Sequence, residues 1–279
     1  MKKTFQKFLP RAIGAKINTI SLYDKKKASK IAFNIFCTPR AGKVSEEQEA
    51  YLKGAKSIKL KTSKNELQSY HWPGKGKKVL LIHGWESNTY RWHLLIKDLK
   101  ERDYDIYAID APAHGHSKGN ILYVTLYAEA IQSAVQAFKP EMIVAHSIGS
   151  LATIFHNFHY KNTDLSKIVL LGPASELSEI MSDYQKILRL NERTMKALEK
   201  LVVKRFGFNF KDFSGAAFAK AIKTPTLLIH DKFDRITPIE ASRAIHKNIT
   251  NSKLIETEGF GHSLYQQEVR DEILKFIEH

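Results

Sequence analysis

The chain has 279 residues, of which 43% are hydrophobic, and a chain of this kind can bury a sizeable core, which excludes disorder as a global description. No stretch approaches the roughly 18 uncharged apolar residues of a membrane span, and residues 1–20 lack the apolar run of a secretory signal, so we expect a cytoplasmic protein. The net charge of +15 would suit a nucleic-acid-binding protein, but residues 1–64 hold 16 Lys and Arg against 4 Asp and Glu, and the remaining chain is nearly neutral. We therefore expect no nucleic-acid partner.

Residues 1–55 are expected to form a basic helical extension. Segments such as KKKASKIAFNIF, residues 25–36, place apolar residues at helical spacing. Two interpretations of the charge stay open, namely an ordinary solvated Lys-rich surface, or peripheral contact with an anionic membrane surface or an acidic partner. Cys37 is the only cysteine, so it cannot form an internal disulfide, and we expect it to be a buried filler residue.

From residue 56 onward, short apolar strands alternate with helical stretches. Eight strands are predicted, at SIKLKT, ELQSYHW, KVLLIHG, DIYAID, MIVAHS, KIVLLG, TPTLLIHD and KLIETEG. Runs such as residues 79–82 consist of Val, Leu and Ile, which is typical of strands buried on both faces of a parallel sheet. We predict one α/β domain over residues 56–279, with an open, mostly parallel sheet flanked by helices and an antiparallel hairpin of the first two strands at its edge.

One segment interrupts this alternation. Residues 173–224 follow the sixth strand and contain no strand pattern. The stretch SELSEIMSDYQKILRLNERTMKALEKLVVKRF, residues 175–206, predicts one long helix or a pair. A helical insertion at the end of the sheet where ligands bind would form a lid.

Polar residues follow several of the predicted strands at the point where each strand ends. HGW follows the third strand, Asp110 the fourth and Ser147 the fifth, while Asp231 and Asp234 follow the seventh and His262 the eighth. Because ligands of an open parallel sheet bind beyond the carboxyl ends of its strands, these side chains are expected to converge. A serine, an acid and a histidine thus occur in this order along the chain.

These motifs resemble those of α/β-hydrolase fold proteins, over about residues 56–279. AHSIG, residues 145–149, resembles the nucleophile elbow, HDKFDRITP the acid turn, and GFGH the terminal histidine loop. HGW resembles the oxyanion-hole turn, and DAPAHGHS resembles the Asp-x-Pro-small-x-Gly-x-Ser loop of the fold. The resemblance implies that Ser147 is the nucleophile, Asp234 the acid and His262 the base, with the backbone N–H groups of Trp85 and Ile148 as oxyanion hole.

The chemistry implied is hydrolysis of a small-molecule carboxylic ester through an acyl-enzyme on Ser147, without a metal or organic cofactor. His262 would take the serine proton during attack, and Asp234 would orient the imidazole. We expect Ser147 to have a positive φ, with small residues two positions before and after it. Thioesterase, lipase and peptidase chemistry stay open, as does a non-catalytic binding protein of the same fold; substrate and oligomeric state are not fixed.

Several other residues allow alternative interpretations. Asp231 could replace Asp234 as the acid, whereas Asp110 is expected to order its own loop. His114 and His116 could be imagined as metal ligands, but no carboxylate or cysteine cluster accompanies them. The remaining histidines considered are expected to be structural donors in tight turns, at His83 and His146, and packing or surface residues, at His156 and His159.

Overall fold

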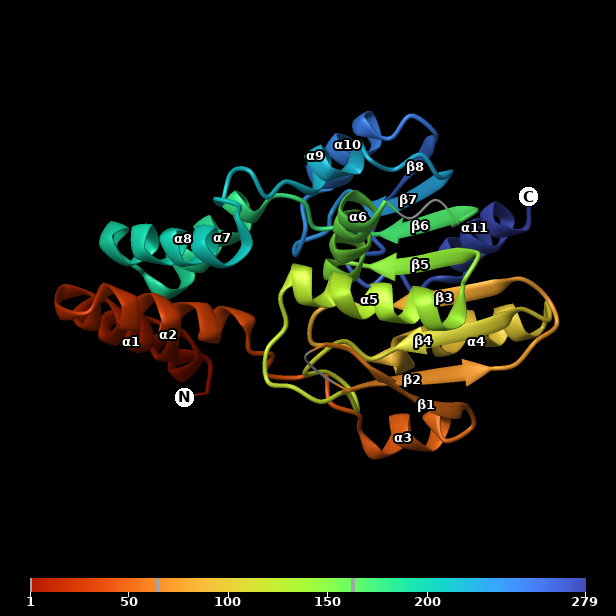
Figure 1. The fold of residues 1–279 in the computed structure, drawn as a ribbon, viewed down its shortest axis with the longest axis horizontal. Coiled ribbons are helices and arrows are strands. Elements are labelled where there is room, and N and C mark those ends of the chain that lie inside the picture. The colour runs from red at the N-terminus through yellow and green to blue at the C-terminus, as the bar shows by residue number, and fades with distance from the viewer. Residues whose placement is uncertain (1, 64–65, 162–163) are drawn as a thin grey trace. The chain divides into compact units, whose positions relative to one another are not determined.

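The eight predicted strands lie in one sheet of a computed structural model that describes residues 2–63, 66–161 and 164–279 (Figure 1). They are β1 (Lys56–Lys61), β2 (Glu66–Trp72), β3 (Lys78–Ile82), β4 (Asp105–Ile109), β5 (Met142–His146), β6 (Lys167–Leu171), β7 (Thr226–Asp231) and β8 (Ser252–Thr257).

The spatial order of the strands is β1-β2-β4-β3-β5-β6-β7-β8. Strands β3 to β8 pair in parallel, whereas β1 pairs antiparallel with β2 and β2 antiparallel with β4. The mostly parallel sheet and its antiparallel edge are thus confirmed. Residues 64–65, part of the predicted turn of the hairpin, lie outside the described residues.

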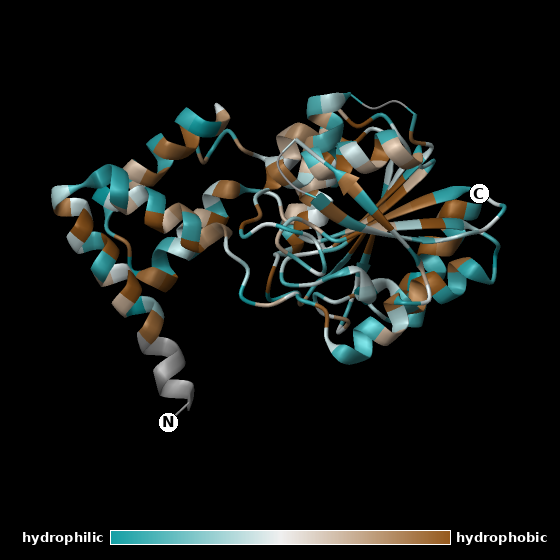
Figure 2. Cartoon of the chain, turned by 60° about the horizontal axis from the view of Figure 1, so that its bottom comes forward, coloured by the Kyte–Doolittle hydropathy of each residue, from teal (hydrophilic) through white to brown (hydrophobic). Residues whose placement is uncertain are grey.

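Helices cover both faces of the sheet. On one face, α4 (His93–Lys100) and α11 (Gln267–Glu278) pack against the strands, and Ile96 and Ile273 share a buried cluster with Leu81 and Val144. On the other face, α5 (Val124–Phe138) and α6 (Ile148–Tyr160) lie side by side (Figure 1). Strand residues of both faces are therefore buried, and Figure 2 shows the central strands as hydrophobic along most of their length.

The shorter elements of this unit surround the sheet. They are α3 (Glu46–Leu52), a 3-10 helix (Thr89–Trp92), α9 (Gly215–Ala219) and α10 (Ile239–Asn248). The loops that leave β3, β5, β7 and β8 at their carboxyl ends carry the candidate site.

A second compact unit is formed by the chain up to Thr38 together with Glu176–Ser214. Its helices are α1 (Lys2–Tyr23), α2 (Lys25–Cys37), α7 (Leu177–Leu188) and α8 (Glu192–Phe206). The extension and the insertion thus fold together as one helical unit, while residues 39–55 and 215–224 belong to the sheet unit. Within residues 2–63, 66–161 and 164–279, no helix is long and apolar enough to cross a membrane.

Candidate active site

Ser147 lies on the sharp turn between β5 and α6. Its backbone has φ 55° and ψ −123°, which confirms the predicted positive φ and is a conformation that non-glycine residues rarely adopt. A side-chain carbon added to Gly149 would lie 2.4 Å from the His83 carbonyl oxygen, so the turn fits only if residue 149 is glycine. Ala145, on the other side of the serine, is fully buried. The small residue predicted two positions after the serine therefore has a steric reason.

The three residues of the predicted triad are brought together. His262 Nε2 lies 3.0 Å from Ser147 Oγ, and His262 Nδ1 lies 2.6 Å from Asp234 Oδ2. Because a carboxylate only accepts hydrogen bonds, Nδ1 carries the proton, and Nε2 of the neutral ring is left to accept the serine hydroxyl. This is the arrangement in which a histidine can act as a base toward a hydroxyl nucleophile.

Asp234 is held in its ionised form by a dense set of donors. Its Oδ1 accepts from the N–H groups of Ile236 and Thr237 at 2.7 and 3.1 Å, and Oδ2 accepts from the Thr237 hydroxyl at 2.9 Å. Burial alone would raise the pKa of this carboxyl, but hydrogen bonds from His230, His262 and the two backbone N–H groups hold it well below its usual range. Asp234 is therefore anionic at neutral pH and can stabilise a cation on His262.

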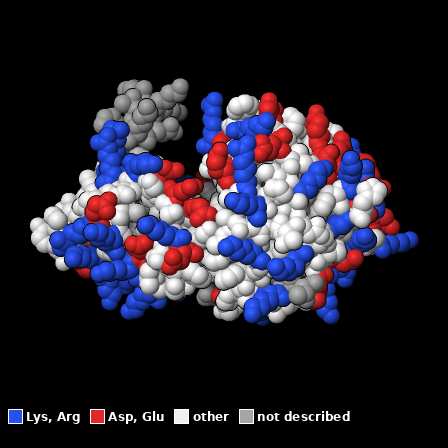
Figure 3. All heavy atoms as spheres, turned by 90° about the horizontal axis from the view of Figure 1, so that it is seen from above, with Lys and Arg blue, Asp and Glu red and all other residues white. Residues whose placement is uncertain are grey.

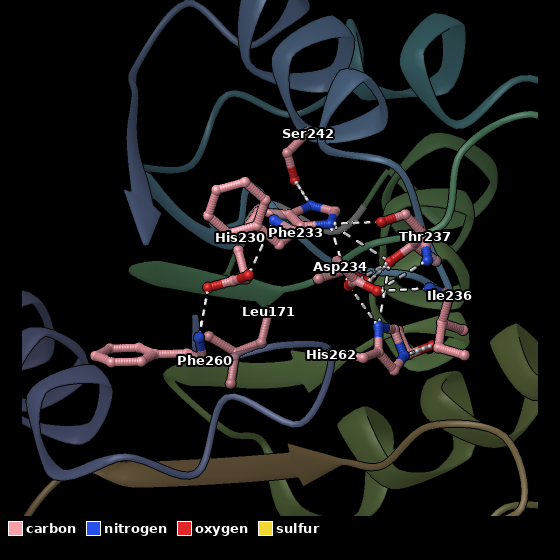
Figure 4. A network of polar contacts seen from close by, with 12 residues as sticks. Leu171, His230, Phe233, Asp234, Ile236, Thr237, Ser242, Phe260 and His262 are labelled. Atoms are coloured by element: carbon pink, nitrogen blue, oxygen red, sulfur yellow. Dashed lines mark hydrogen bonds and ion pairs between the residues drawn. The ribbon is translucent and has the colours of Figure 1, made fainter. Parts of the chain in front are cut away.

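A second histidine contacts the same carboxylate, and sequence reasoning missed it. Figure 4 shows Asp234 between His230 and His262. His230 Nε2 lies 3.3 Å from Asp234 Oδ2 and 3.0 Å from the Thr237 carbonyl, while its Nδ1 lies 2.7 Å from Ser242 Oγ. Because a carbonyl only accepts, Nε2 carries a proton. His230 therefore fixes the acid turn, and its place in β7 just before that turn was the available signal.

The turn after β3 borders the serine. A side-chain carbon added to Gly84 would lie 3.0 Å from Ser147 Cβ. His83 Nε2 accepts the Ala111 N–H at 2.9 Å, so its Nδ1 carries the proton and donates to the Gly84 carbonyl at 2.7 Å. Burial lowers the pKa of His83 and keeps the ring neutral, as this pairing requires. His83 is thus a structural donor in a tight turn, as expected.

This contact also orients the predicted oxyanion donor. The described residues contain no cis peptide bond, and the C=O and N–H of a trans peptide point in opposite directions. Fixing the Gly84 carbonyl therefore fixes the Trp85 N–H as well. Ile148, the other predicted donor, is the first residue of α6, where N–H groups have no intrahelical acceptor. Their role as an oxyanion hole stays a prediction.

Two buried side chains hold consecutive carbonyl groups of the histidine loop. His146 Nε2 donates to the His262 carbonyl at 2.8 Å, and Arg91 Nη2 donates to the Ser263 carbonyl at 2.7 Å. Burial, followed by the charge of Arg91, lowers the pKa of His146 well below its ordinary value, so the ring is neutral. His146 has the predicted structural role, whereas Arg91 was missed because its contact is 172 residues away in the sequence.

The alternative residues have other partners. Asp231 accepts from the N–H groups of Phe233 and Phe260, and thus orders turns next to the site. Asp110 accepts from the N–H groups of Thr89 and His116, so it orders its loop as expected. Neither acid is bonded to His262 among the described residues.

His114 and Cys37 are both buried, and each has a local environment that accounts for it. His114 uses Nδ1 for the Pro112 carbonyl and Nε2 for the Glu86 N–H. No group of three or more potential ligands gathers anywhere in the described part of the chain. Burial raises the pKa of the Cys37 thiol to about 12, which makes it unreactive at neutral pH.

Comparisons with known proteins show that the chain is similar to hydrolases. A family model described as "Serine aminopeptidase, S33" matches residues 75–212, and one described as "TAP-like protein" matches residues 214–278. The AB hydrolase superfamily protein YisY of Bacillus subtilis is 20% identical over 70% of this chain and 88% of its own length. A pimeloyl-[acyl-carrier protein] methyl ester esterase of Vibrio atlanticus is 28% identical over 39% of this chain and 41% of its own length.

Solved structures with the same fold include esterases. An esterase from Exiguobacterium antarcticum has a TM-score of 0.64 at 16% identity, covering 80% of this chain and 100% of that chain. An esterase from Pyrococcus furiosus has a TM-score of 0.64 at 20% identity, covering 87% of this chain and 96% of that chain. At these identities the likeness establishes a shared fold.

Proposed function

The chain belongs to the α/β-hydrolase superfamily, and from this premise we propose that it is a serine hydrolase that cleaves carboxylic esters through an acyl-enzyme on Ser147. The observation that carries the proposal is the continuous contact from Ser147 Oγ to His262 to Asp234, at 3.0 and 2.6 Å. The esterases among the similar proteins support the choice of an ester bond.

The proposed reaction has two halves. In the first, His262 Nε2 takes the Ser147 proton as Oγ attacks the ester carbonyl, and the protonated ring then gives this proton to the leaving alcohol. In the second, His262 takes a proton from water as the water attacks the acyl-enzyme, and the protonated ring returns a proton to Ser147 Oγ as the acid is released. Asp234 stabilises the imidazolium in both halves. The N–H groups of Trp85 and Ile148 would stabilise the oxyanion, and one such donor is typically worth about 3 to 4 kcal/mol of barrier.

Labelling with a fluorophosphonate probe tests the nucleophile. The wild type should be labelled and Ser147→Ala should not. Ser150→Ala is the matched control, because Ser150 is buried in the first turn of α6, three residues after Ser147, and its hydroxyl donates to the Leu171 carbonyl. We expect this control to label as the wild type does. An unlabelled wild type would instead indicate a non-catalytic binding protein.

Peptide-bond cleavage is the second candidate, because the matched family model is described as a serine aminopeptidase. The two candidates separate on a panel of p-nitrophenyl esters, acyl thioesters and aminoacyl p-nitroanilides. An esterase should hydrolyse the esters with a kcat/KM at least about a hundredfold above that for the anilides. Turnover of the anilides at a comparable rate would favour the peptidase.

A further inference from the structure

The helical unit carries an unusual surplus of positive charge. Residues 1–38 hold nine Lys or Arg and a single acid, Asp24. Asp24 is itself engaged, since its carboxylate accepts the N–H of Lys27 at 2.8 Å and caps α2. Figure 3 shows Lys and Arg side chains gathered on the surface of this unit. The charge is therefore presented on a folded helical surface.

The corner between α1 and α2 is fixed in place by the insertion. Arg193 on α8 donates to the carbonyls of Ser21 and Leu22 at 2.8 and 3.0 Å. Asn18 donates its amide to the Arg189 carbonyl at 2.9 Å. Helix α2 is held as well, since Tyr184 donates its hydroxyl to the Ala32 carbonyl at 2.8 Å. The corner is thus a rigid, preorganised surface.

Large apolar side chains lie at this corner beside the lysines. Leu22 is 55% exposed and Tyr23 is 88% exposed. Three lysines follow shortly after, at positions 25, 26 and 27, and all three are exposed. No acidic side chain in the described part of the chain forms an ion pair with any of these lysines. We call these five residues the basic corner. The same outward side of α1 continues through exposed Leu9, Ala12, Lys16 and Thr19.

We propose that the basic corner docks the protein on an anionic lipid bilayer. The lysines are attracted by anionic headgroups, and each one near the surface strengthens binding about fivefold. Tyr23 has an apolar ring and a polar hydroxyl, which suits the level of the headgroups, and Leu22 can insert beside it. A nucleic acid would be held mainly through its phosphates, whereas a lipid surface offers anionic headgroups to the lysines and an apolar layer to the exposed leucine. The lipid surface is therefore the occupant that accounts for both kinds of residue.

Sedimentation of the full-length protein with lipid vesicles tests the proposal. The protein should bind vesicles of phosphatidylcholine with one third phosphatidylglycerol, and binding to pure phosphatidylcholine should be far weaker. The triple variant Lys25→Gln, Lys26→Gln, Lys27→Gln should bind about a hundredfold more weakly. The double variant Leu22→Ser, Tyr23→Ser should also bind more weakly, by about tenfold.

A matched control separates the corner from net charge. Lys75, Lys77 and Lys100 are exposed lysines of the sheet unit, and their triple Gln variant has the same total charge as the corner variant. We expect it to bind vesicles as the wild type does. An equal loss of vesicle binding in both triple variants would overturn the proposal, because it would indicate nonspecific attraction of the whole protein to the lipid charge. Binding to an oligonucleotide without binding to vesicles would also overturn it. If the protein dimerises in the absence of lipid and the corner variants abolish this dimer, the basic corner would instead bind a second copy of the chain, which would overturn the proposal.

The single native thiol allows direct detection of the contact. Cys37 is buried and unreactive, so a Tyr23→Cys variant can be labelled selectively at its new thiol with an environment-sensitive fluorophore. Its emission should shift to shorter wavelength on addition of anionic vesicles, and an unchanged spectrum would contradict docking at this corner. Fluorophosphonate labelling of Ser147 serves as an independent measure of the sheet unit, so failure of the docking proposal is distinguishable from failure of the proposed function.

Discussion

Arg91 places a buried positive charge beside the histidine loop. Burying this charge is unfavourable, because the guanidinium loses its hydration. The side chain is 7% exposed, its guanidinium faces the rings of Trp92 and Tyr265, and Nη1 has no partner among the described residues. Burial lowers the pKa of Arg91 to about 10, so it is still charged at neutral pH. Replacing a poorly compensated buried ion by an apolar residue of similar length is often neutral for stability.

Arg91→Met should therefore separate stability from activity. We expect the free energy of unfolding to change by less than about 1 kcal/mol, because the lost hydrogen bond is offset by the removal of a buried charge. We expect kcat to fall about tenfold, because the carbonyl of Ser263 is released and His262 is less well placed. Urea unfolding and ester turnover measure the two quantities. A large loss of stability with unchanged kcat would show that Arg91 serves packing alone.

The lowered pKa of Asp234 predicts that the stability of the fold depends on pH. Its pKa is depressed in the folded protein, whereas an unfolded aspartate titrates near about 3.9. The unfolded state therefore takes up its proton first as the pH falls. The stability that the ionised form contributes is complete above about pH 5, and it is lost progressively as the pH falls from about 4 toward the depressed pKa of the folded state.

Comparison with Asp234→Asn isolates this contribution from that of other acids. The wild type should exceed the variant in free energy of unfolding by about 3 kcal/mol at neutral pH, and the difference should shrink as the pH is lowered toward 3. Urea denaturation at several pH values measures it. A difference that grows toward low pH would contradict the assigned sign.

The limits of sequence reasoning at the residue scale follow from distance along the chain. Ser147, Asp234 and His262 were predicted because each belongs to a short local motif at a strand end. Arg91 and His230, which hold the histidine loop and the acid turn, were not predicted, because their contacts depend on the assembled sheet. Arg91 reaches a carbonyl 172 residues away, and a buried arginine has no sequence pattern of its own.

At the scale of elements, the elbow couples helix α6 to the turn after β3. Residue 149 lies inside the first turn of the helix, where alanine is normally more stable than glycine by up to about 1 kcal/mol. Here the added carbon would lie 2.4 Å from the His83 carbonyl oxygen and 2.9 Å from the Ile82 carbonyl oxygen. Both neighbours are backbone atoms, so the clash cannot be relieved by a rotamer change.

Gly149→Ala is therefore expected to destabilise the protein, although alanine normally stabilises a helix relative to glycine. We expect destabilisation by about 1 to 3 kcal/mol together with a strong loss of ester turnover, because the turn that carries Gly84 and Trp85 must move. Thermal unfolding and kcat test this. A stabilised variant with normal turnover would mean that the elbow has more room than its geometry indicates.

The elements of the sheet could be predicted from the sequence because buried strands such as β3 and β6 are short runs of Val, Leu and Ile. The pattern of residues 175–206 was compatible with either one long helix or a pair of helices, and the structure shows a pair. Arg189 ends α7 at φ 53°, and the side chain of Asn191 caps α8 by accepting the Thr194 N–H at 2.8 Å. Asn191 followed by the acidic Glu192 is typical of a helix N-terminus, and this signal in the sequence favours a pair of helices over one long helix.

At the scale of the whole molecule, the two segments that the sequence separated as extension and insertion depend on each other. Phe33 of α2 packs against Phe206 of α8 with ring centroids 5.9 Å apart, and Arg205 lies over the Phe33 ring. Local patterning indicated a helical extension, and one long helix or a pair in the insertion, but could not show that their apolar faces meet, because the two segments are more than 130 residues apart. The pairing emerges only from tertiary packing.

Deletion of residues 1–38 should therefore affect the two units differently. Without α1 and α2, the apolar faces of α7 and α8 lose their cover, and short helix pairs are marginal without tertiary packing. We expect chymotrypsin to cut within residues 177–206 at least about tenfold faster than in the full chain. The sheet unit retains all its strands and the Ser147–His262–Asp234 contacts, so fluorophosphonate labelling should persist. Protection of α7 and α8 in the truncated protein would show that the pair is stable alone, whereas loss of labelling would show that the units fold as one.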